Sequence, residues 1–235
     1  MVPATWTTEI AFLAKQGYSQ MVVNFRGSTG FGRERIRLLP GKIGEMDIFD
    51  CYQAARFCLD KRNCDPERSF VTGGSHGGFI TCHLVAAFPD LFQAAVTRNP
   101  ATNLAAMTAI SDIPDWVLYQ VNGEEWAQRQ PASKTEISKL SHLGNVTATF
   151  LAKAYEKSPI SKVREVTTPI LFQLGKNDVR VPPSQGLSFH KAIQGQGGVS
   201  EVSWYGNDNH PLGTVDSMAD VSLNLYRWFE SQGRV

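Results

Sequence analysis

Short apolar runs alternate with segments of helical periodicity along most of this chain, and this alternation restricts its fold more than any other feature. Apolar runs of this kind are typical of strands buried on both faces, as in a parallel sheet. Apolar residues at helical spacing, such as Ile48, Tyr52 and Ala55, indicate helices that cover such a sheet. The pattern predicts an α/β fold with a mostly parallel sheet and helices on both faces. Strands are expected at 21–25, 70–72, 94–97, 170–174 and, as a sheet edge, 199–205.

Size and composition favour one large globular domain over residues 1–235. The 235 residues are 42% hydrophobic and 19% charged, which is sufficient for a substantial core. Residues 111–157 interrupt the strand-helix rhythm, and we expect them to form an excursion over the sheet that shapes a substrate pocket.

The charge balance narrows the classes of partner. A formal net charge of +1 gives no general attraction to nucleic acid or to an anionic membrane.

The N-terminus lacks the pattern of a secretory leader, and no apolar stretch is long enough to span a bilayer. The four cysteines lack the spacing of a zinc site and are expected to be reduced thiols. These features predict a cytoplasmic protein that binds no nucleic acid, membrane or metal.

Residues 69–79 carry the strongest chemical signal. A short apolar run leads into Gly73-Gly74-Ser75-His76-Gly77, the pattern G-x-S-x-G, and a helical stretch follows. A sharp strand-to-helix turn would expose the Ser75 hydroxyl above the sheet, and glycines at 73 and 77 would relieve backbone crowding there. The amide of His76 would then point at an oxyanion. The alternative interpretation is an ordinary glycine-rich turn between a strand and a helix.

An acid and a base follow Ser75 in the expected order. Asp178 follows the apolar run 170–174 after a short turn, and His210 lies in a loop between 202–205 and the last amphipathic segment. In a serine hydrolase His210 would deprotonate Ser75, and Asp178 would orient the imidazole. Asp208 is a weaker candidate for the acid because it lies only two residues from His210. Asp178 could instead be a turn residue, and His210 an exposed loop residue.

Nucleotide binding is not predicted. Residues 27–34 have the glycine spacing of a P-loop, but Arg33 and Glu34 stand where lysine and serine or threonine are required. No G-x-G-x-x-G follows a predicted strand in register, which excludes the dinucleotide fingerprint. We therefore expect no cofactor.

Several blocks, in one order along the chain, resemble the acylaminoacyl-peptidase branch of the prolyl oligopeptidase family. The segment 24–32, Asn-Phe-Arg-Gly-Ser-Thr-Gly-Phe-Gly, is similar to a signature of that branch, and 73–79 is similar to its nucleophile elbow. The other similar blocks are Arg98-Asn99-Pro100, Asp112-Ile113-Pro114-Asp115-Trp116, Lys157-Ser158-Pro159-Ile160 and Asp178-Val179-Arg180-Val181-Pro182.

The resemblance implies an α/β-hydrolase fold and a serine peptidase. Such an enzyme hydrolyses N-acylated short peptides in the cytosol, releases an N-acylated amino acid, and usually works as a homo-oligomer. Arg180 is similar to the family arginine that contacts a substrate carbonyl, and Val181 to a residue of the primary specificity pocket. Trp116 is suggested as a further wall of that pocket.

The chain also departs from this family. Members carry an N-terminal β-propeller, and they carry a strand and an H-G-G-P-type loop just before the position of Met1. We therefore expect an N-terminally truncated hydrolase domain that lacks those strands and the propeller. That loop supplies an oxyanion donor, and losing one donor costs about 10²–10³ in rate. Two alternatives stay open: a weak or inactive domain acting as a structural or binding partner, and a general esterase or dipeptidyl peptidase.

Overall fold

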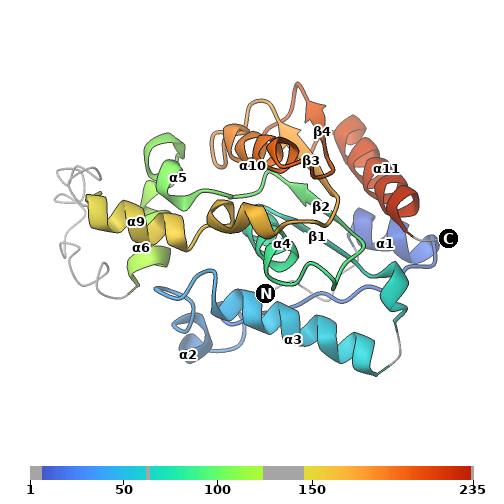
Figure 1. Cartoon of the computed structure of the whole chain (residues 1–235), viewed down its shortest axis with the longest axis horizontal. Helices are drawn as coiled ribbons and strands as arrows, with labels where there is room; N and C mark the ends of the chain where they lie inside the picture. Colours follow the sequence, from blue (N-terminus) through green and yellow to red (C-terminus); the bar gives the residue numbers. More distant parts are fainter. Residues whose placement is uncertain (1–6, 62–63, 124–145, 234–235) are drawn as a thin grey trace.

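The computed structural model describes residues 7–61, 64–123 and 146–233, and its centre is a parallel sheet (Figure 1). The strands β1 (Phe70–Gly74), β2 (Ala94–Arg98), β3 (Ile170–Gly175) and β4 (Ser200–Tyr205) lie in that order across the sheet. Every neighbouring pair is parallel. The expected strands at 70–72, 94–97, 170–174 and 199–205 are therefore confirmed, the last as an edge.

Both faces of the sheet are covered by helices. On one face lie α4 (His76–Ala87) and α10 (Ser184–Gly195), and on the other lie α11 (Val215–Gln232) and α1 (Thr8–Lys15). Successive strand residues alternate between the two cores: Ala95 and Phe172 pack under α4 and α10, whereas Val96 and Leu171 pack under α11. This alternation follows from the period-two geometry of a strand and confirms the two-faced α/β architecture.

The other helices among the described residues lie outside these two layers. The helix α3 (Met46–Asp60) packs against α4, and the short α2 (Arg33–Ile36) precedes it. The helices α5 (Leu104–Ile110), α6 (Pro114–Asn122) and α9 (Ala148–Glu156) gather beyond one end of the sheet (Figure 1). The 3₁₀ segments within the described ranges are η1 (Pro66–Arg68) and η3 (Pro159–Glu165). The predicted excursion thus contains α6 and α9, although 124–145 lie outside the described residues.

The expected strand at 21–25 is wrong. This segment has no assigned strand, and Met21 and Val22 are exposed. Together with β1 and with Cys51 and Ala55 of α3, it lines a groove of about 1270 Å³. An extended segment becomes a strand only when a neighbour completes its hydrogen-bond ladder, and within the described sheet β1 pairs only with β2.

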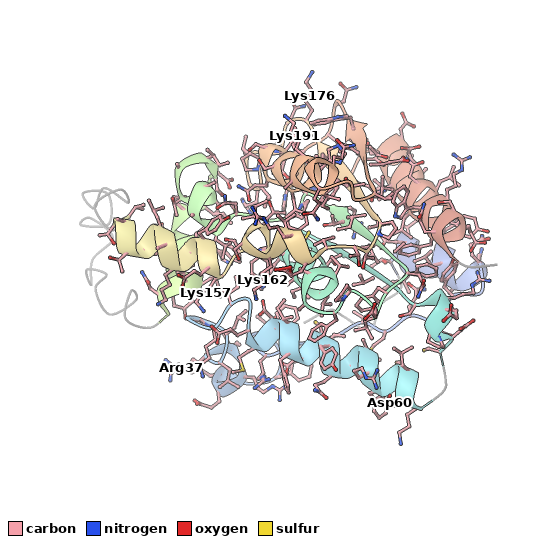
Figure 2. The ribbon with its side chains drawn as sticks, viewed as in Figure 1. Arg37, Asp60, Lys157, Lys162, Lys176 and Lys191 are labelled. Carbon is pink, nitrogen blue, oxygen red and sulfur yellow. The ribbon has the colours of Figure 1, made fainter. Side chains whose placement is uncertain are left out.

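The surface carries dispersed charges. Figure 2 shows Arg37, Asp60 and Lys176 at the periphery of the molecule. Among the described helices, none has the length and apolar character needed to cross a bilayer.

Candidate active site

Ser75 occupies the sharp turn between β1 and α4. Its φ of 57° and ψ of −118° are unusual for a residue with a side chain, and such strain costs about 1–3 kcal/mol. The turn is held from both sides: the Ser75 amide donates to the Arg98 carbonyl at 2.8 Å, and the Ser75 carbonyl accepts from the Phe79 amide at 3.0 Å. A strained serine at the carboxyl end of a parallel strand is the geometry of a nucleophile elbow.

Close backbone packing explains one of the two predicted glycine requirements. A Cβ on Gly73 would lie 2.4 Å from the Gly77 backbone, so no side chain fits at 73. The expectation for Gly77 is wrong, because a Cβ there would meet nothing within 4 Å. The second position that requires glycine is Gly78, where a Cβ would lie 2.4 Å from Thr97 Oγ1 and 2.8 Å from Pro100 Cβ.

Adjacent glycines therefore offer a matched test of this packing. We expect Gly78→Ala to lower the free energy of unfolding by about 1–3 kcal/mol, because it overpacks the contact between α4 and the end of β2. The change Gly77→Ala adds the same methyl group to open space in a helix, so it should be neutral or stabilising by up to about 1 kcal/mol. Urea unfolding followed by circular dichroism measures both, and equal effects would contradict the packing argument.

Asp178 and His210 form a close pair at the same edge of the sheet. Asp178 follows β3, His210 follows β4, and His210 Nδ1 lies 2.7 Å from Asp178 Oδ2. The Asp178 side chain is fully buried, and its Oδ1 accepts the amides of Arg180 and Val181 at 2.8 and 2.9 Å. Since an ionised carboxylate only accepts, Nδ1 carries the proton, and Nε2 of the neutral ring is left with a lone pair.

Asp208 has a different role from that of an orienting acid. Its carboxylate accepts the amides of Asn209, Gly213 and Thr214 and the Thr214 hydroxyl, so it closes the loop that carries His210. Burial raises the pKa of Asp208, but hydrogen bonds from Ser217 and Thr214 outweigh it and lower this pKa to about 2. The carboxylate is thus charged at neutral pH and committed to the loop backbone.

Asn99 is a residue whose importance sequence reasoning missed. It is buried, has a φ of 41°, and follows β2. Its Oδ1 accepts the Gly175 amide at 2.9 Å, and its Nδ2 donates to the His210 carbonyl at 3.0 Å. Asn99 therefore joins the end of β3 to the loop that carries His210. The available signal was an asparagine directly after a strand, where a side-chain amide and tolerance of positive φ are both useful.

The residues suggested for substrate binding lie in different environments. Arg180 is exposed and forms an ion pair with Asp112, with Nε 2.6 Å from Oδ1. Val181 is buried in the main core beside Asp178. Trp116 of α6 packs edge-on against the His76 ring, with 5.7 Å between ring centroids. Arg180 therefore lies beside Asp178, and Trp116 lies beside the residue that follows Ser75.

The parallel sheet, the elbow at Ser75 and the Asp178–His210 pair define an α/β-hydrolase domain. Solved structures share this fold: a puromycin hydrolase has a TM-score of 0.80 at 22% identity, covering 98% of this chain and 32% of that one. An acylaminoacyl peptidase of Pyrococcus horikoshii has a TM-score of 0.79 at 22% identity, covering 96% and 34%.

The chain belongs to the prolyl oligopeptidase family, whose model matches residues 4–234. It is 38% identical over 227 residues to the acylamino-acid-releasing enzyme of Arabidopsis thaliana, covering 97% of this chain and 28% of that protein. The Rattus norvegicus enzyme of the same name is 35% identical, with 96% and 29% covered. This chain thus spans somewhat over a quarter of the length of these curated relatives.

Proposed function

We propose that this domain is a serine peptidase in which Ser75 is the nucleophile, His210 the base and Asp178 the residue that orients the base. The 2.7 Å contact between His210 Nδ1 and Asp178 Oδ2 carries the proposal, because it fixes the tautomer with a free Nε2 at the sheet edge where Ser75 lies. The His76 amide is the proposed oxyanion donor, since it opens α4 and follows the nucleophile directly.

The reaction follows from these roles. Nε2 of His210 takes the Ser75 hydroxyl proton while Oγ bonds to the substrate carbonyl carbon, and the carbonyl electron pair becomes an oxyanion facing the His76 amide. Collapse of this intermediate breaks the C–N bond, and the imidazolium returns the proton to the leaving amine. Water then repeats the sequence on the acyl-enzyme. Asp178 stabilises the imidazolium in both halves.

The proposed substrate is an N-acylated short peptide, from which an N-acylated amino acid is released. The names of the curated relatives support this class. Arg180 is proposed to contact a substrate carbonyl, and Val181 and Trp116 to shape the pocket for the side chain. The ion pair with Asp112 holds the Arg180 guanidinium in place.

Comparing one peptide in two forms tests this proposal. We expect the N-acetylated peptide to have a kcat/KM at least about 10²-fold above that of the same peptide with a free amine, because an ammonium group removed from water needs a carboxylate partner. Asp112, the carboxylate beside Arg180, is already paired. Release of the N-acetylated amino acid is measured by chromatography. Preference for the free amine would indicate a dipeptidyl peptidase, cleavage of simple esters alone a general esterase, and no turnover an inactive domain.

We further propose that the protein works in the cytosol and as a homo-oligomer. The described cysteines are all free thiols, which is typical of a reducing compartment. The oligomer is supported only by the resemblance to the family.

A further inference from the structure

A second carboxylate–imidazole pair joins α3 to His76, the residue that follows Ser75 in the elbow. Asp47, in the first turn of α3, has a fully buried side chain, and its Oδ2 is 2.8 Å from His76 Nε2. Its Oδ1 accepts the amide of Gly44 at 2.8 Å and that of Ile48 at 3.1 Å. Three donors thus fix a carboxylate that would be costly to bury alone. Since this carboxylate accepts, Nε2 of His76 carries the proton.

The His76 ring is also fixed by packing. It lies edge-on to Phe25, Phe79 and Trp116, with centroid separations of 5.3, 5.5 and 5.7 Å. These contacts and the bond to Asp47 leave the side chain little freedom to rotate. Because His76 is the residue after Ser75, a fixed ring also fixes the backbone unit whose amide would face the oxyanion.

We propose that Asp47 and His76 are positioning residues that hold the His76 amide in the direction required by the transition state. This inference rests on the proposed function. Neither side chain takes a proton in the reaction, since His76 Nε2 is bound to a buried carboxylate on the side of α3. The geometric requirement is strict, because a displacement of about 1 Å at such a site can cost about 10²-fold in rate.

The informative variant is His76→Phe, which keeps an aromatic ring but removes the hydrogen bond to Asp47. We expect kcat to fall by about 10²-fold while KM changes by less than about 3-fold, because the amide acts mainly on the transition state. His76→Gln restores a side-chain donor and should recover part of kcat. Rates are expressed per active site, titrated with a fluorophosphonate, so that unfolded protein does not contribute.

Asp47→Asn provides an independent variant that retains shape and volume. Its amide oxygen still accepts from Gly44 and Ile48, and its amide nitrogen can donate to Nε2 if the imidazole changes tautomer. We expect a loss of about 10-fold or less in kcat, and His76→Phe added to Asp47→Asn should cost less than in the wild type. Additive effects of the two changes would overturn the pairing.

His190→Phe is the matched control. His190 is another half-buried histidine held by one side-chain hydrogen bond, with Nδ1 2.8 Å from Ser200 Oγ, on α10 and away from the elbow. We expect its kcat per titrated site to equal that of the wild type. If His76→Phe also keeps the wild-type kcat per labelled site, the inference is wrong and the proposed function stands. If the folded wild-type protein takes no label, both are wrong.

Discussion

Ser75→Ala is expected to abolish labelling by a fluorophosphonate and to lower kcat by about 10⁶-fold. Alanine keeps the backbone of the elbow but has no Oγ, so no acyl-enzyme forms, and the other two side chains then contribute almost nothing because the three act as one unit. Labelling is followed by intact-protein mass spectrometry, and hydrolysis by release of the N-acetylated amino acid.

The control for Ser75→Ala is its fold. The substitution leaves the amide bonded to Arg98 and the carbonyl bonded to Phe79, so the circular dichroism spectrum should match that of the wild type. Label retained by folded Ser75→Ala would show that another residue reacts, and the mechanism proposed above would then be rejected.

Asp178→Asn is expected to lower kcat by about 10⁴-fold with little change in structure. The asparagine oxygen still accepts the amides of Arg180 and Val181, so the loop after β3 keeps its shape. Its amide nitrogen, however, faces His210 Nδ1 as a donor, which places the imidazole proton on Nε2. An imidazole with that tautomer cannot accept the proton of Ser75. Steady-state kinetics on the N-acetylated peptide measures the loss.

Asp208→Asn is the matched control for that variant. It makes the same chemical change in the loop of the base, but Asp208 binds loop backbone and the Thr214 hydroxyl rather than the imidazole. We expect a loss of about 10-fold or less in kcat, together with lower stability. A loss at Asp208 equal to that at Asp178 would mean that loop geometry, rather than tautomer selection, explains both results.

The sequence predicted those parts of the fold and site that depend on a short, continuous stretch of residues. The strand at 170–174 was predictable because its residues are buried on both faces, and Asp178 was predictable because it follows that strand after a short turn. The same reasoning failed at 21–25, where an equally apolar run lies beside a groove rather than in the sheet. An apolar run indicates that its residues tend to be buried. A strand also needs a neighbouring strand close enough for hydrogen bonding, and no local pattern predicts that neighbour.

The residues that hold the site together were harder to predict. Asp47 lies 29 residues before His76, and its sequence neighbourhood resembles an ordinary helix start. Gly78 is required because of Thr97 and Pro100, whereas the motif itself points to Gly77. Each of these cases depends on a contact between distant segments, which a single sequence without a structure does not reveal.

The end of β2 carries none of the three proposed catalytic side chains, yet it binds the backbone of two of the residues that do. The carbonyl of Arg98 accepts the Ser75 amide, and the side chain of the next residue, Asn99, donates to the His210 carbonyl. Two consecutive residues, one through its backbone and one through its side chain, thus anchor Ser75 and His210 to the same strand end. Motion of the surrounding helices and loops can therefore change access to this edge of the sheet while the backbones of Ser75 and His210 keep a common anchor at the end of β2.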